Sequence, residues 1–211
     1  METQWLAFSV AALVVTMVPG PDTFLVLGNS LTGHVRRGFA AVAGILSGGL
    51  FHMALFGVGA AQLLAYSERA FFVVKLAGAA YLVYLGVGAL RSALWPRAAA
   101  EAVTAAELAP SSPLRRSYVQ GLLTNALNPK VAVFYLAFLP QFLAPGDHLV
   151  RDSLLMIAIH YAMSAVWLGM VVLGVSRMAR VLRDVRVVRT LEGLVGAMML
   201  GFGVRLALTA R

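Results

Sequence analysis

Cysteine is absent from this sequence of 211 residues, and charged residues are scarce, at 12%. The lack of cysteine excludes disulfides, thiolate metal sites and dithiol redox chemistry. The shortage of charge argues against a water-soluble domain, because such domains carry roughly 25% charged residues. Hydrophobic residues make up 60% of the chain instead. The composition therefore predicts an integral membrane protein.

Six apolar stretches are each close to, or longer than, the roughly 20 residues that a helix needs to cross a bilayer. Their apolar character is continuous and lacks the strict alternation of membrane strands, and a lipid-exposed backbone must satisfy its own hydrogen bonds. The sequence thus predicts an all-α integral membrane protein with six transmembrane helices. These cover approximately residues 4–31, 38–66, 71–94, 118–143, 154–175 and 191–208.

One long connection, residues 95–113, is polar and rich in alanine and proline, and it separates the first three stretches from the last three. We therefore expect a single transmembrane domain over residues 1–211. It would consist of one repeat at about 1–95, a cytoplasmic linker at about 96–115 and a second repeat at about 116–211. Because each half has three spans, the second half lies inverted relative to the first.

Basic residues are unevenly distributed between the connections. The second and fourth connections carry only Arg69 and Arg151, whereas the others carry Arg36, Arg37, Arg91, Arg97, Arg115, Arg116, Arg177, Arg180, Arg183, Arg186 and Arg189. By the positive-inside rule the arginine-rich connections are cytoplasmic and both termini lie outside. The net charge of +8 thus reflects topology, and no aromatic or polar readers accompany it, so no nucleic-acid partner is expected.

The arginines between residues 177 and 189 recur at every third position with apolar residues between them. Two interpretations fit this pattern. The segment is either a plain positive-inside loop or a short amphipathic helix that lies on an anionic leaflet.

Proline interrupts the first and the fourth predicted helices. The first contains the sequence MVPGPD at residues 17–22, and the fourth contains Asn128-Pro129-Lys130. In both, a charged residue follows the proline: Asp22 follows Pro21, and Lys130 follows Pro129. Paired interruptions in corresponding helices of inverted halves point to the central site of a transporter. The predicted site residues at the breaks are Pro19, Gly20, Pro21, Asp22, Asn128, Pro129 and Lys130.

Charged groups can interact with the unpaired backbone groups at such breaks. Proline cannot continue the hydrogen-bond ladder, so free carbonyls end one half-helix and free amides begin the next. The amides attract an anion such as the carboxylate of an amino acid, and carbonyls or Asp22 suit its ammonium group. Lys130 needs an anion, and Asp22 and the substrate carboxylate are the candidates. Two alternatives stay open: Asp22 caps the second half-helix, or Lys130 reaches the cytoplasmic face.

His52 and His160 occupy corresponding places in the second and fifth spans. Histidine titrates near physiological pH, so both residues are candidates for proton coupling. The alternative for each is a neutral histidine that is hydrogen-bonded between helices. In the second and third spans, glycines recur about one turn apart, which predicts close packing between helices.

Five segments carry a resemblance that covers nearly the whole chain. They are PGPD at 19–22, the glycine-rich second span with His52, KLAGAAYLVYLG at 75–86, TNALNPKVAVFYLAFLPQF at 124–142 and GLVGAMMLGFGVRLAL at 193–208. Together they resemble the LysE/RhtB superfamily of amino-acid exporters, and the first break looks more like the RhtB branch, which handles homoserine, threonine or leucine. The resemblance implies a multi-pass exporter in the bacterial inner membrane, surrounded by lipid and driven by a proton or another ion gradient. It implies no cofactor, and the sequence has no phosphate-binding loop.

Other classes stay open beside this one: a channel, an exporter of basic amino acids or of metal cations, and an intramembrane hydrolase. The hydrolase would pair Ser47 with His52 or His160, but Ser47 and His52 are five residues apart on one helix, which is an awkward separation for a direct hydrogen bond. We therefore expect no enzyme and no resident metal. The oligomeric state is open, with a homo-oligomer as one alternative.

Overall fold

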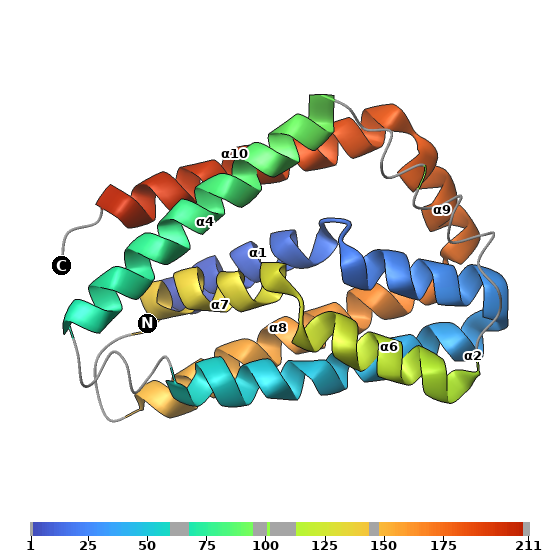
Figure 1. The fold of residues 1–211 in the computed structure, drawn as a ribbon, viewed down its shortest axis with the longest axis horizontal. Coiled ribbons are helices and arrows are strands. Elements are labelled where there is room, and N and C mark those ends of the chain that lie inside the picture. The colour runs from blue at the N-terminus through green and yellow to red at the C-terminus, as the bar shows by residue number, and fades with distance from the viewer. Residues whose placement is uncertain (1, 60–67, 95–100, 102–112, 144–147, 209–211) are drawn as a thin grey trace.

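The computed structural model describes residues 2–59, 68–94, 101, 113–143 and 148–208 (Figure 1). These residues are almost entirely helical, and no strand occurs among them, which confirms the all-α prediction. The helices are α1 (Glu2–Met17), α2 (Pro21–His52), the π-helical turn η1 (Met53–Val58), α4 (Glu68–Leu94), α6 (Leu114–Ala126), α7 (Pro129–Phe142), α8 (Leu149–Leu173), α9 (Val175–Arg183) and α10 (Val185–Leu208).

Within the described ranges, four helical segments are long and apolar enough to cross a membrane, and a bent pair adds a fifth. The four are Val35–Gly57, Leu114–Phe142, Leu149–Leu173 and Val185–Arg205, and the bent pair is Gln4–Met17 with Pro21–Leu31. The third predicted span is found only as the shorter apolar helix Ala79–Leu94 within α4. Six spans therefore stay a prediction, and most of the predicted linker lies outside the described residues.

Helix α2 turns back on itself near its middle (Figure 1). A Cβ on Gly38 would overlap the hydroxyl of Ser30, although a straight helix would separate two such residues by about 12 Å. The first arm of α2 thus completes the first predicted span, and the second arm forms the second. The predicted connection between residues 31 and 38 is a turn within a continuously helical backbone.

The segment between Gly174 and Asp184 is the helix α9, so the plain-loop interpretation is wrong. Met178 and Ala179 pack against the core while Arg177 and Arg180 are exposed, as the alternation of apolar and basic residues requires. Helix α10 also begins earlier than the predicted sixth span, because Asp184 accepts a hydrogen bond from the backbone N–H of Arg186 and so starts the helix (2.9 Å).

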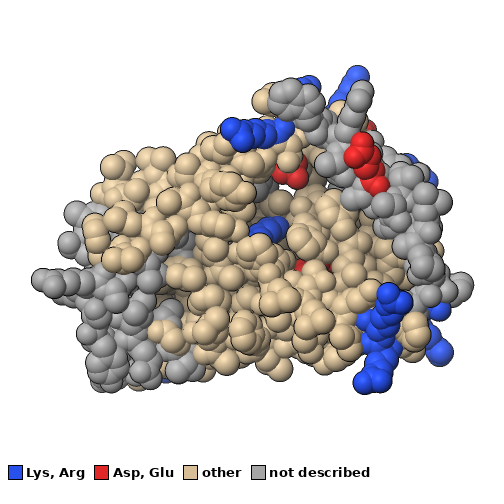
Figure 2. All heavy atoms as spheres, viewed as in Figure 1, with Lys and Arg blue, Asp and Glu red and all other residues tan. Residues whose placement is uncertain are grey.

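The basic connections gather at one end of the molecule. Figure 1 shows the turn of α2, the start of α6 and α9 at this end, and the start of α1 and the end of α10 at the other. Figure 2 shows a face made mostly of uncharged atoms, with basic side chains concentrated toward the α9 end. The arginine distribution predicts this grouping of the connections.

Close helix contacts organise the interior. Helix α2 packs along α6 and α4 along α10. The contacts depend on glycine: a Cβ on Gly86 would lie 2.9 Å from the carbonyl oxygen of Gly196, and a Cβ on Gly196 would lie 2.8 Å from that of Gly86. The packing role predicted for the glycines of the second and third spans is thus confirmed at Gly44, Gly48 and Gly86, but not at Gly88, where a Cβ would meet nothing within 4 Å.

Candidate functional site

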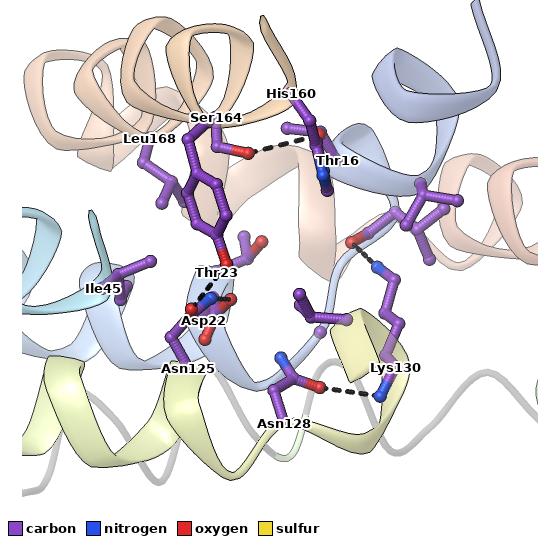
Figure 3. Close-up of a pocket in the computed structure, with 15 residues that line it drawn as sticks. Thr16, Asp22, Thr23, Ile45, Asn125, Asn128, Lys130, His160, Ser164 and Leu168 are labelled. Carbon is purple, nitrogen blue, oxygen red and sulfur yellow. Dashed lines mark hydrogen bonds between the residues drawn. The ribbon is translucent and has the colours of Figure 1, made fainter. Parts of the chain in front are cut away.

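The two predicted breaks lie against one cavity. Helix α1 ends at Met17, and α2 begins at Pro21 after a bend of 48°. Helix α6 ends at Ala126, and α7 begins at Pro129. The cavity between them measures about 40 Å³ (Figure 3). It is lined by Val15, Thr16, Val18, Gly20, Asp22, Thr23, Ile45, Asn125, Asn128, Lys130, Val131, His160, Tyr161, Ser164 and Leu168.

Most of the predicted site residues are brought together here. Gly20, Asp22, Asn128, Lys130 and His160 line the cavity. The three prolines are not among the lining residues, and they act through the backbone: Pro21 and Pro129 each occupy the first turn of a helix, where a missing N–H costs nothing. His52 also lies outside the lining, although its ring contacts a residue that belongs to it.

Asp22 lies in the first turn of α2, where the helix dipole favours a negative charge. Its side chain does not cap its own helix, because the N-cap is Gly20 and no side-chain cap bond is present there. Instead, Oδ2 of Asp22 accepts a hydrogen bond from Nδ2 of Asn125 at 2.9 Å. The other oxygen, Oδ1, is buried and has no hydrogen-bond partner within the described part of the chain. One oxygen of this half-buried carboxylate is therefore left without a hydrogen bond from the described residues.

Lys130 reaches from α7 to the end of α1. Its Nζ donates to the backbone carbonyl of Val18 at 3.0 Å, and its backbone N–H donates to Oδ1 of Asn128, the N-cap of α7, also at 3.0 Å. The ammonium thus lies between helices in this conformation, and not at a solvent-facing end. It also forms no direct ion pair with Asp22, contrary to one expectation from the sequence. The negative end of the α1 dipole contributes to its stabilisation.

The side chain of each charged residue contacts the other helix break, so the two contacts are crossed. Asp22, which follows the first break, contacts Asn125 at the end of α6, whereas Lys130, which follows the second break, contacts Val18 at the end of α1. Each charged side chain therefore contacts the helix end that precedes the other break. In Figure 3 the two side chains lie on different sides of the cavity.

Both histidines are hydrogen-bonded to another helix. Nε2 of His52 lies 2.8 Å from the backbone oxygen of Asn125, and Nδ1 of His160 lies 2.6 Å from the hydroxyl of Tyr135. Nδ1 of His52 is buried without a partner among the described residues. These contacts fit the interhelical alternative for both residues, and proton coupling stays a prediction.

Several polar residues of the site were missed by the sequence analysis. Asn125 donates to Asp22, and its Oδ1 accepts a hydrogen bond from the hydroxyl of Tyr161 at 2.9 Å. The hydroxyls of Thr16 and Ser164 face each other at 3.4 Å, and Thr16 also donates to the carbonyl of Ala12. A polar side chain within an apolar span is itself a signal of function, and Asn125 precedes the Asn-Pro-Lys segment closely enough to have been included.

The dyad considered for Ser47 with His52 or His160 is not formed among the described residues, in which His160 contacts Tyr135. The hydroxyl of Ser47 donates to the carbonyl of Ala43 and accepts from Tyr118, both at 2.9 Å, while Nε2 of His52 contacts Asn125. Ser47 and His52 are therefore not hydrogen-bonded to each other. Across the described ranges, no group of three or more histidine, aspartate or glutamate side chains is placed to hold a metal ion.

Comparison with known proteins gives a consistent result. The family model "LysE type translocator" matches residues 13–210. A leucine efflux protein of Klebsiella pneumoniae is 30% identical over 96% of this chain and 94% of its own length. A homoserine/homoserine lactone efflux protein of Salmonella typhimurium is 31% identical over 72% of this chain and 70% of its own. An uncharacterized membrane protein of Pseudomonas aeruginosa is 34% identical over 97% of this chain and 95% of its own.

No solved structure gives a significant match. The family model, in contrast, extends over both helix breaks and nearly all of the helical segments that surround the cavity. This chain is a membrane protein that belongs to the LysE type translocator family.

Proposed function

We propose that the protein exports neutral amino acids across the bacterial inner membrane by secondary active transport. The observation that carries the proposal is the presence of one acid and one base, Asp22 and Lys130, on different sides of a single cavity at two helix breaks. One group of each sign suits a zwitterion, whereas a basic amino acid would require more acid. The printed functions of the Klebsiella and Salmonella relatives, leucine and homoserine efflux, support the same substrate class.

The substrate ammonium binds to Oδ1 of Asp22, which is buried and has no partner within the described part of the molecule. The substrate carboxylate binds to Lys130, whose ammonium has three donors, one of which is bonded to Val18 within the described residues. Val15, Ile45 and Leu168 then provide an apolar lining for an aliphatic side chain. This orientation matches each charged end of the substrate with an opposite charge.

Transport proceeds by alternating access between two inverted three-helix repeats. A cavity of about 40 Å³ holds a few water molecules but no leucine, so it must widen to admit a substrate of this size. Gly86 lies in the last helix of the first proposed repeat, and Gly196 lies in the last helix of the second. A Cβ on either glycine would contact the carbonyl oxygen of the other, and this reciprocity supports the internal symmetry. The arginine-rich end faces the cytoplasm, both termini lie outside, and a proton is the coupling ion.

Efflux from cells tests the proposal. Cells that express the protein are loaded in parallel with leucine, threonine, homoserine and lysine, and export is measured with and without a protonophore. We expect protonophore-sensitive, saturable export of at least one neutral amino acid and none of lysine. Export that does not saturate and is insensitive to the protonophore would favour a channel. Export of lysine alone would contradict the proposed substrate class.

The hydroxyl pair of Thr16 and Ser164 makes a prediction about selectivity. At 3.4 Å the two hydroxyls bind each other weakly, and both line the cavity, so they are placed to hydrogen-bond a hydroxylated substrate. Thr16→Val removes one hydroxyl with little change of shape. We expect export of homoserine to fall about tenfold relative to leucine, since a lost hydrogen bond costs up to ~1.5 kcal/mol. An unchanged ratio of the two export rates would exclude Thr16 from selectivity.

A further inference from the structure

The end of α1 is unusually rich in carbonyl groups without helical partners. In a continuous helix, the carbonyl of residue i accepts from the N–H of residue i+4. Pro19 and Pro21 have no N–H, so the carbonyls of Val15 and Met17 lose these partners by covalent structure alone. The carbonyl of Val18 comes next in the chain and points at Lys130. The end of α1 therefore carries carbonyls without helical partners, and the one at Val18 faces the Lys130 ammonium beside the cavity.

Such a helix end is a place for a cation. Inside a membrane, carbonyls released at the C-terminal end of a half-helix coordinate the coupling cation of many secondary transporters. The helix dipole adds to the attraction, and partial burial between helices weakens the screening of this attraction by water. A site of this kind binds a cation, which is either a free ion or the charged group of a side chain.

In this protein the cation at the helix end is a side chain. Nζ of Lys130 lies 3.0 Å from the carbonyl oxygen of Val18, and a Cβ built on Gly20 would lie 3.5 Å from the same nitrogen. The ammonium therefore lies against the short segment that joins α1 to α2. Asp22 forms no direct ion pair with it, so the carbonyl oxygen is the only hydrogen-bonded partner that the described residues provide for this charge.

We propose that the Lys130 ammonium takes the place of a free coupling metal cation at the first helix break. The inference rests on the proposed transport function. It adds that the positive charge at this break is the Lys130 ammonium and not a metal ion. Two consequences follow. Efflux by the native protein needs no sodium, and a variant without the ammonium has a vacant site for a small monovalent cation.

Sodium dependence tests the first consequence on the unaltered protein. Purified protein is reconstituted in liposomes loaded with leucine, and efflux is driven by an imposed proton gradient in sodium chloride or in choline chloride. We expect equal rates in the two salts. A rate that falls when sodium is replaced would overturn the proposal, and this result does not depend on whether any variant folds.

Thermal unfolding of Lys130→Ala tests the second consequence without any transport measurement. The purified variant is heated in choline chloride, sodium chloride or ethylammonium chloride. We expect sodium or ethylammonium to raise the unfolding midpoint by about 5–10 °C at roughly 100 times its Kd, and to leave the native protein unaffected. Arg151→Ala, which removes an exposed basic side chain paired with Asp152, is the control and should show no such rise.

The outcomes separate the two proposals. If neither cation stabilises Lys130→Ala beyond the control, the cation role of Lys130 is wrong even if amino-acid efflux is found. If a cation stabilises the variant but the native protein exports no amino acid, the cation role stands and the substrate class falls. Lys130→Met fills much of the space with an uncharged chain, and it should show a smaller stabilisation than Lys130→Ala.

Discussion

Asp22→Asn should abolish efflux while the protein remains folded and inserted. The substitution keeps the shape of the side chain and removes its charge, so the buried Oδ1 is no longer available as an anion for the substrate ammonium. The new amide can also turn a donor toward Nδ2 of Asn125, the present partner of the carboxylate. Loss of a charged hydrogen bond worth up to ~3 kcal/mol corresponds to a fall of about 100-fold in efflux.

The measurement is efflux of leucine and homoserine at matched amounts of protein in the membrane. Asp152→Asn is the matched control, because Asp152 forms an ion pair with the exposed Arg151 and is not among the residues that line the cavity. The control should retain native efflux, since exposed ion pairs contribute little. Full activity of Asp22→Asn would remove Asp22 from the mechanism and with it the proposed orientation of the substrate.

The helix breaks were predictable from sequence because their cause is local. Proline removes a specific hydrogen bond wherever it occurs, so the ends of α1 and α6 and the starts of α2 and α7 follow from Pro19, Pro21 and Pro129. The charged residues beside the prolines were equally visible, because charge is rare inside an apolar span. His160 was chosen together with His52 because the two occupy corresponding spans, and of the pair only His160 lines the cavity.

The crossed contacts were not predictable, because they depend on how the helices pack. No local rule says that Asp22 will contact Asn125 while Lys130 contacts Val18, and a direct pairing of the two charges was one of two alternatives from the sequence. The turn within α2 is a similar case, since its helical backbone continues through a change of direction. For the segment that forms α9, the sequence allowed both a loop and a helix, because alternating basic and apolar residues fit either. The packing of Met178 and Ala179 against the core favours the helix.

Close packing of α2 against α6 leads to a second large effect, for Gly44→Val. A Cβ on Gly44 would overlap the backbone carbonyl of Tyr118, and in return a Cβ on Gly121 would overlap that of Ala41. A helix backbone cannot yield as a flexible side chain does, so the two helices must separate. We expect a loss of stability of about 3 kcal/mol or more, the upper part of the range for overpacked interiors. The midpoint of thermal unfolding in detergent measures it.

Gly201→Val is the matched control for the same change of residue. Gly201 lies in α10, and a Cβ there would meet nothing within 4 Å, so stability should change by less than about 1 kcal/mol. Separation of α2 from α6 has a consequence for the site as well. Asn125 belongs to α6 and contacts both His52 and Asp22 of α2, so any Gly44→Val protein that survives should also export poorly. Native stability of Gly44→Val would mean that the two helices lie farther apart than the structure places them.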